Sequence, residues 1–240
     1  MYRNTDPAKL VRALIEEAPR GADMPPETSF LPRGRTVTVS RDCGAKGEEI
    51  ARRLASCLGV QCFDRELLTA MVHEAEVDHA LLEKLDERVR SLMDEVVREV
   101  LSSKHFGTAK FRATLLRVVL GIASTGGVIV GRGANLILAR REVYRVRITG
   151  TPLVCAQQLA EKEHTSVQIA LQSVEKVNAE RAEFIRYHFA RDINTPSDYD
   201  MMLNSDQLKV DDAARILTYA MQTAGFTVPT ASRMTCGAGR

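Results

Sequence analysis

A glycine-bearing stretch near the start of the chain, "SRDCGAKGEEIARRL" from Ser40 to Leu54, has the residue types of a phosphate-binding loop. The residues before it, "RTVTVS", alternate apolar and polar side chains as a strand does. The residues after it carry one apolar stripe, typical of a helix. A strand, a glycine turn and a helix N-terminus together point free backbone N–H groups at an anion. The stretch is therefore predicted to bind phosphate.

The loop departs from the common phosphate-loop motif. In G-x-x-x-x-G-K-[ST], the lysine reaches the β- and γ-phosphates and the hydroxyl ligates magnesium. Here the lysine position falls on Gly47 and the hydroxyl position on Glu48, while Lys46 stands one residue early. By itself the motif is weak, and an ordinary strand-to-helix turn is the alternative.

A second candidate group is an arginine on a long predicted helix, from Ser166 to about Ala190. One stripe of this helix is formed by Val174, Val177, Phe184 and His188. Arg181 falls on this stripe, so it needs an anionic partner, either a bound phosphate or a structural carboxylate. Arg186 lies about 140° further round the helix and on periodicity alone faces solvent.

Composition limits the class of protein. A chain of 240 residues with 45% hydrophobic content is long enough for one substantial α/β domain. Lys and Arg total 33 against 31 Asp and Glu, so we expect neither nucleic acid nor a membrane as partner. No apolar run approaches the roughly 20 residues of a membrane span. A small anionic substrate fits this composition.

The cysteines and the N-terminus suggest a compartment. The five cysteines are scattered and form no C-x-x-C pair, so we expect reduced thiols. The first residues lack the apolar region of a secretory signal. Together these features predict a cytoplasmic protein. The histidine spacing fits no zinc site.

Strands and helices alternate along most of the chain. Strands are predicted at 36–40, 60–63, 126–131, 144–149 and 199–203, and helices at 134–141, 152–163, 166–190 and 211–222. This alternation predicts a largely parallel sheet covered on both faces. Ligands of such sheets bind beyond the carboxyl ends of the strands. The residues to inspect are therefore 40–47, Asp64, Arg65, 131–135, Gly150 and Asn204.

A further predicted helix, residues 78–101, carries a wider apolar stripe than one core contact requires. It either packs on its own chain or forms a homodimer contact.

Three blocks, in chain order, resemble the cytidylate kinase-like family of P-loop proteins. They are "SRDCGAKGEEIARRLASCLGVQCFDRELL", "GVIVGRGAN" and "RAEFIRYHFARDINTPSDYDMMLNSDQL". The resemblance covers about residues 36–222 and implies a P-loop nucleoside-kinase-like three-layer α/β fold. Its parallel five-stranded sheet has the order 2-3-1-4-5. The implied domain spans 35–223, with a helical insert at about 65–125 and a lid at about 152–195, between an N-terminal extension (1–34) and a flexible tail (224–240).

The resemblance also implies a function, the ATP- and Mg²⁺-dependent phosphorylation of a pyrimidine nucleoside monophosphate such as CMP or dCMP. ATP-binding residues would be Arg41, Gly44, Ala45, Lys46, Gly47 and Glu48, and acceptor-binding residues Asp64, Arg65, Arg132 and Asn135. Catalytic residues would be Lys46, Asp64, Arg181 and Arg186. Asp64 and Asn135 have a structural alternative, which is to cap the helices that follow them.

The chain also departs from its relatives, whose loops commonly read S-R-x-x-G-S-G-G-R-E-I-A. The missing lysine is thus a family trait, and Lys46 and Arg41 are expected to provide the charge instead. Lys46 itself replaces a glycine, and Ala156 stands near a position where relatives often carry a lid arginine. Gly47, Glu48 and Ala156 together leave a second hypothesis, a regulatory nucleotide-binding module with weak or no catalysis.

Overall fold

The computed structural model describes residues 6–16, 35–77, 109–139 and 141–229. The predicted helix at 78–101 lies outside these residues, as do most of the N-terminal extension and the end of the tail. None of the helices in the described part is long and apolar enough to cross a membrane.

The centre of the fold is a five-stranded parallel sheet. Its strands are β1 (Thr36–Arg41), β2 (Cys62–Phe63), β3 (Gly127–Val130), β4 (Tyr144–Thr149) and β5 (Met201–Asn204). Their spatial order is β2-β3-β1-β4-β5, so the predicted order is confirmed. Val39 of β1 pairs with Val130 on one side and Val146 on the other. All six residues of β1 are buried, as expected for the central strand of a doubly covered sheet.

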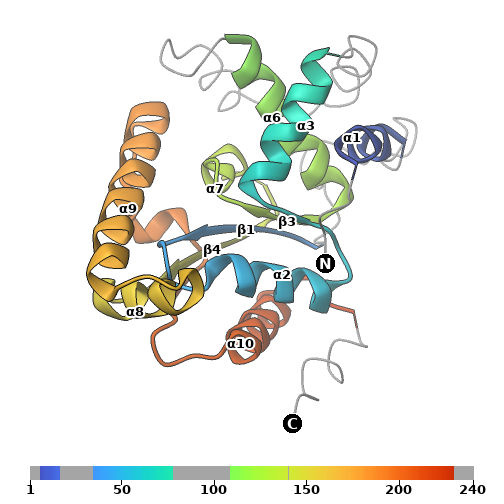
Figure 1. Ribbon diagram of the computed structural model, residues 1–240. Coiled ribbons are helices and arrows are strands. Elements are labelled where there is room, and N and C mark those ends of the chain that lie inside the picture. Colours follow the sequence, from blue (N-terminus) through green and yellow to red (C-terminus); the bar gives the residue numbers. More distant parts are fainter. Residues whose placement is uncertain (1–5, 17–34, 78–108, 140, 230–240) are drawn as a thin grey trace.

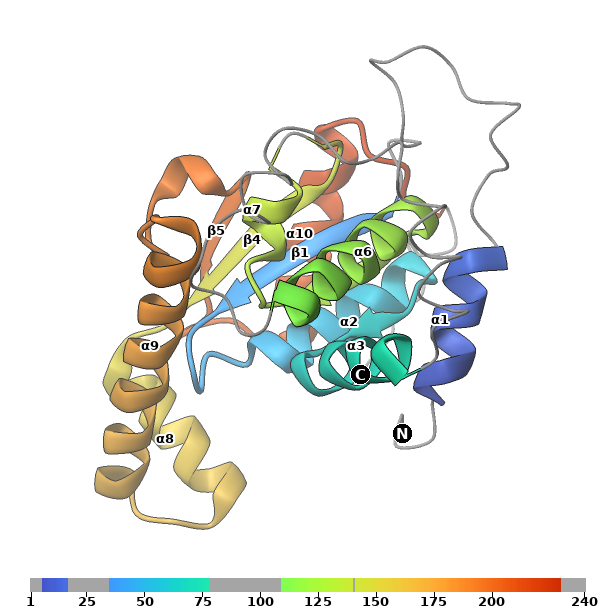
Figure 2. The same cartoon turned by 90° about the horizontal axis from the view of Figure 1, so that it is seen from above.

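Helices cover both faces of the sheet (Figure 1). Two pack together on one face, α2 (Gly47–Leu58) and α10 (Val210–Thr223). The other face carries α3 (Arg65–Val77), α6 (Ala109–Thr125) and the short α7 (Ala134–Ile137), and α1 (Pro7–Glu16) packs on α3. A further pair, α8 (Pro152–Glu163) and α9 (Val167–Phe189), stands beyond the carboxyl ends of the strands (Figures 1 and 2), and a 3-10 turn at Pro196–Asp198 leads into β5.

Each face of the sheet has its own apolar core. Ile50, Leu54 and Leu58, one stripe of α2, are completely buried against the sheet. On the other face the core includes Leu68 of α3 and Leu120 of α6. Val11 of α1 belongs to that second core and is fully buried, so the described part of the N-terminal extension is packed on the domain.

Two sequence-based expectations need correction. The helix predicted at 134–141 ends at Ile137, because the chain turns there, with the Arg141 N–H bonded to the Leu138 carbonyl, and enters β4 at Tyr144. The cysteines are not all reduced, since Cys57 is disulfide-bonded, whereas Cys43, Cys62 and Cys155 are free.

Candidate active site

The loop between β1 and α2 forms a cradle of backbone N–H groups at the carboxyl end of the central strand. Ser205 Oγ donates to the Ala45 carbonyl at 2.8 Å and holds the loop against the end of β5. Within the described residues, the N–H groups of Gly44, Lys46 and Gly47 have no hydrogen-bond partner. Unpaired N–H groups at the start of a twelve-residue helix attract an anion, so the loop has the chemistry of a phosphate site.

An ion pair crosses this loop. Arg41 Nε and Nη2 lie 2.9 and 2.8 Å from the same Glu48 carboxylate oxygen. Arg181 of α9 adds a second cation, with Nη2 at 3.7 Å from that oxygen and Nη1 donating to the Arg41 carbonyl at 3.0 Å. Burial of Glu48 acts to raise its pKa, but the charges of Arg41 and Arg181 outweigh burial, and the pKa is lowered. Glu48 is therefore ionised at neutral pH.

The Lys46 side chain has carbonyl partners in the segment after β5. Lys46 has a left-handed backbone, with φ of 57°, at the N-cap of α2. Its Nζ donates to the carbonyl oxygens of Leu208 at 3.0 Å and Ser205 at 3.4 Å. The side chain thus ties the loop to the segment after β5, and its contact with phosphate stays a prediction.

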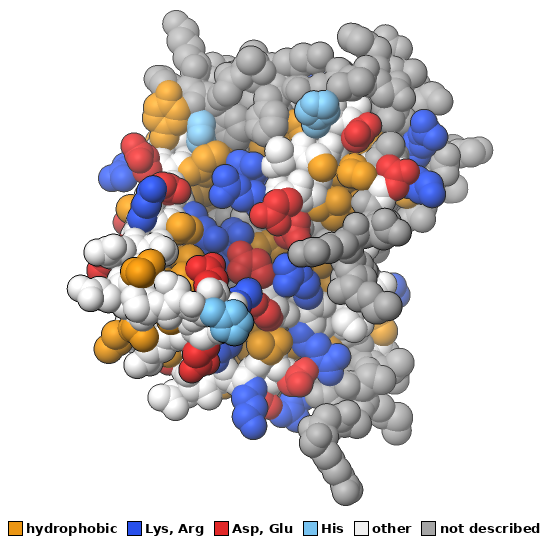
Figure 3. All heavy atoms as spheres, viewed as in Figure 1, with side chains coloured by type: hydrophobic (Ala, Val, Ile, Leu, Met, Phe, Trp, Pro, Cys, Tyr) orange, Lys and Arg blue, Asp and Glu red, His pale blue; other side chains and the backbone are white. Residues whose placement is uncertain are grey.

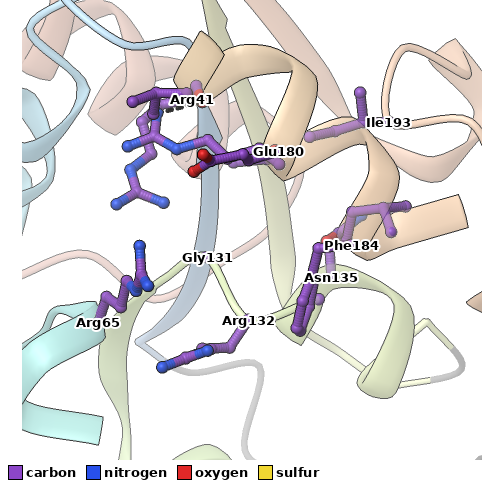
Figure 4. Close-up of a pocket in the computed structure, with 13 residues that line it drawn as sticks. Arg41, Arg65, Gly131, Arg132, Asn135, Glu180, Phe184 and Ile193 are labelled. Atoms are coloured by element: carbon purple, nitrogen blue, oxygen red, sulfur yellow. Dashed lines mark hydrogen bonds between the residues drawn. The ribbon is translucent and has the colours of Figure 1, made fainter. Parts of the chain in front are cut away.

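A cavity opens beside the loop, at the carboxyl edge of the sheet. Its polar lining includes Arg41, Arg65, Arg132, Arg181, Asn135 and Glu180, and its apolar wall Val177, Phe184, Ile185 and Ile193. Figure 3 shows basic side chains gathered in the hollow of this face, with acidic ones beside them. Arg41, Arg65 and Arg132 come from three different elements around the cavity, with Glu180 of α9 on a further side (Figure 4).

Arg132 is placed by an unusual backbone turn directly after β3. Its φ is 56°, between Gly131 at 78° and Gly133 at 69°. Nη2 donates to Thr69 Oγ1 at 2.7 Å, while Nε is buried without a partner among the described residues. Burial, followed by the charges of Arg65 and Arg41, lowers the pKa of Arg132. A partly buried group of mutually repelling guanidiniums is suited to an anionic ligand.

Asp64 and Asn135, for which helix capping was the structural alternative, differ in the structure. Asp64 Oδ1 accepts the N–H of Leu67 at 3.0 Å, which is the capping contact for α3, and Asp64 does not line the cavity. Its part in binding the acceptor stays a prediction. Asn135 lines the cavity and is buried, and it is not a cap because α7 has Gly133 at its N-cap.

The face assignments on α9 match the helical periodicity. Arg181 lines the cavity with Val177 and Phe184, whereas Arg186 is exposed and lies away from it. Sequence reasoning missed Asn178, whose Oδ1 accepts the N–H of Cys43 at 2.8 Å and fastens α9 to the phosphate loop. It also missed Glu180, although both residues neighbour Arg181 on the helix. Ala156, near which a lid arginine was expected from the resemblance, is fully buried.

The loop offers groups that suit the phosphates of ATP but few that suit a magnesium ion. The free N–H groups suit the phosphates of ATP. No group of three or more His, Cys, Asp or Glu in the described part of the chain could hold a metal ion, and Glu49 pairs with Lys162 at 2.5 Å. Magnesium in kinases is held largely by substrate phosphates and waters, with one or two carboxylates. At the start of α2, Glu48 pairs with Arg41 and Glu49 with Lys162, so a magnesium ion would be held mainly by the phosphates and by water.

Comparison with known proteins places this geometry in a family. The model of the cytidylate kinase-like family matches residues 36–207, which include the loop, the cavity and α9. An uncharacterized protein from Eubacterium ventriosum has a similar fold, with a TM-score of 0.65, 18% identity, and coverage of 79% of this chain and 98% of that chain.

Shikimate kinase from Bacteroides thetaiotaomicron aligns over 78% of this chain and 98% of its own, at 15% identity. Its TM-score of 0.43 is too low to bear on function. None of the curated proteins matches the chain. The family match spans well over half of the sequence and coincides with the phosphate cradle and the arginine-lined cavity, and the chain accordingly belongs to the cytidylate kinase-like family.

Proposed function

We propose that the protein transfers the γ-phosphoryl group of ATP to a pyrimidine nucleoside monophosphate such as CMP or dCMP. Family membership supports a nucleotide kinase, and such kinases use ATP with Mg²⁺. The observation that carries the proposal is the arginine-lined cavity directly beside the N–H cradle. Phosphoryl transfer requires this arrangement, because donor and acceptor phosphates must approach each other in line.

The charge of the cavity favours a phosphate monoester as acceptor. Four arginines line it, with Glu180 in the lining and Glu48 beside Arg41 as carboxylates, while the charge of nearby Asp42 is paired with Arg147. The arginines thus exceed these carboxylates by two, which matches a dianionic phosphate. Guanidinium groups bind two phosphate oxygens at once, so Arg132 and Arg65 suit the acceptor phosphate.

The remaining lining residues suit the rest of the acceptor. Phe184, Ile185 and Ile193 offer apolar surface for a flat ring, and Asn135 offers an amide for hydrogen bonding. Arg181 lies between the cradle and the cavity, where negative charge develops during transfer. The preference for a pyrimidine base is the most specific part of the proposal, and it rests on the family name.

A coupled assay of ADP formation, run with Mg–ATP across CMP, dCMP, UMP, AMP and GMP, tests the proposal. We expect the highest kcat/KM with CMP or dCMP. Calorimetry with ATP is the companion measurement. ATP binding without transfer to any acceptor would favour the regulatory module instead, and absence of both would refute a nucleotide kinase.

A further inference from the structure

Two positions of the phosphate loop have exchanged residue types relative to the common motif. With the motif's lysine position at Gly47, its first glycine position falls on Arg41. The motif therefore has glycine and lysine where this chain has arginine and glycine. Each arrangement has one cation. In the common motif it is the lysine at the end of the loop, whereas in this chain it is Arg41 at the start.

The structure shows that these two positions compete for the same space. A Cβ atom built on Gly47 would lie 2.4 Å from Arg41 Cβ and 2.7 Å from Arg41 Cγ. Contacts this short do not occur between real side chains. The stem of Arg41 therefore occupies the place where a lysine side chain at position 47 would begin.

The Arg41 guanidinium also lies where a phosphate-binding cation is needed. Its side chain is only 8% exposed, and it extends from the end of β1 into the lining of the cavity (Figure 4). Nη1 would lie 2.6 Å from a Cβ atom on Gly131, in the turn that carries Arg132. The guanidinium thus lies between the cradle and the acceptor cavity. Lys46 does not reach this place, since its Nζ is bonded to the Leu208 and Ser205 carbonyls.

We propose that Arg41 is the cation that binds the transferring phosphates in this loop, in place of a lysine at position 47. The inference deepens the proposed function and rests on it. Glu48 holds Nε and Nη2 of Arg41 and so fixes the guanidinium before ATP arrives. Nη1, on the cavity side, is then directed at a phosphate oxygen. A planar guanidinium can serve both partners, which an ammonium group cannot do with the same geometry.

The test moves the cation back to its common position. Isothermal titration calorimetry compares wild type, Arg41→Gly, Gly47→Lys and the double variant R41G/G47K, with Mg–ATP and with tripolyphosphate as ligands. We expect Arg41→Gly to weaken both by roughly ten- to hundredfold, the range for losing charge-assisted hydrogen bonds. Gly47→Lys alone should also weaken binding, because the two stems collide. The double variant should recover to within about threefold of wild type.

Two controls separate a folding defect from lost binding. Arg53→Ala removes a positive charge from α2 outside the cavity lining, where it pairs with Asp211 of α10, and should leave both affinities within about twofold. Circular dichroism and thermal melting check each variant. Arg41→Lys retains the strand and a cation, so it should lose less affinity than Arg41→Gly.

The outcomes distinguish the inference from the proposed function. If Arg41→Gly binds both ligands like wild type, or if R41G/G47K binds no better than Arg41→Gly, the role of Arg41 is overturned while the kinase proposal stands. If binding depends on Arg41 but no acceptor is phosphorylated, the inference stands and the kinase proposal fails. Wild type that binds neither ATP nor tripolyphosphate overturns both.

Discussion

Arg147 of β4 donates a 2.6 Å hydrogen bond to Oδ1 of Asp42, the first residue of the phosphate loop after β1. Only 3% of the Arg147 side chain is exposed, and 16% of Asp42. Arg147 also donates to Asn194 Oδ1 at 3.1 Å. The base of the loop is thus fixed to β4 by a buried ion pair.

This pair predicts a large loss of stability when one partner is removed. Arg147→Met leaves the Asp42 charge mostly buried without its cation, so the free energy of unfolding should fall by about 3 kcal/mol. Urea denaturation measures it. The double variant D42N/R147M should be more stable than Arg147→Met, because it leaves no unpaired charge. A loss below about 1 kcal/mol for Arg147→Met would contradict a structural role for the pair.

Arg132 should act on the acceptor and not on ATP. Arg132→Ala should weaken binding of the nucleoside monophosphate by about 2 kcal/mol, a typical loss for a charge-assisted contact, with ATP affinity nearly unchanged. Calorimetry with each ligand checks this. Arg215→Ala on the outer face of α10 is a control for the loss of one positive charge. Equal losses for both ligands would refute the division between donor and acceptor sites.

The two arginines of α9 should differ in their effect on the rate. Arg181 contacts the Arg41 carbonyl and lines the cavity, whereas Arg186 is exposed. Arg181→Ala should lower kcat by about a hundredfold or more, the scale for losing a group that stabilises transferring charge. Arg186→Ala should change kcat by less than about threefold. Similar losses in both variants would indicate that α9 rearranges when nucleotides bind.

The Arg41–Glu48 pair predicts a dependence of stability on pH. Burial raises the pKa of Glu48, but Arg41 and Arg181 outweigh it and bring the pKa below its usual 4.5. Since the folded-state pKa is below the unfolded one, the pair stabilises the protein fully above about pH 4.5, and this contribution disappears as the pH falls through the folded-state pKa. The stability difference between wild type and Glu48→Gln should therefore be constant at neutral pH and shrink in acid. Urea denaturation of both proteins across this pH range measures the difference. A difference that grows as the pH falls would contradict the prediction.

Much of the fold follows from local patterns. The apolar run at 126–131 and the alternating residues at 144–149 predicted β3 and β4, and the strand order followed from the family resemblance. Helical periodicity correctly placed Arg181 toward the cavity and Arg186 away from it. Periodicity works here because one face of α9 must pack against the domain.

The partners of polar side chains could not be predicted in the same way. A local pattern gives the direction of a side chain but not the group opposite it. Lys46 finds two carbonyls about 160 residues further along the chain, and Cys43 finds Asn178. The motif alone shows that Arg41 and Gly47 have exchanged residue types, but not that their side chains would compete for the same space, which depends on the position of the Arg41 stem.

The left-handed turn at Gly131, Arg132 and Gly133 puts stability and activity in opposition. A positive φ disfavours arginine by roughly 1–2 kcal/mol, whereas glycine adopts it without strain. Arg132→Gly should thus relieve strain and remove the repulsion of Arg132 by Arg65 and Arg41. Selection for thermal robustness alone would discard Arg132. Arg132 is therefore retained although it lowers the stability of the fold. We expect variants selected in the laboratory for stability to lose Arg132 early.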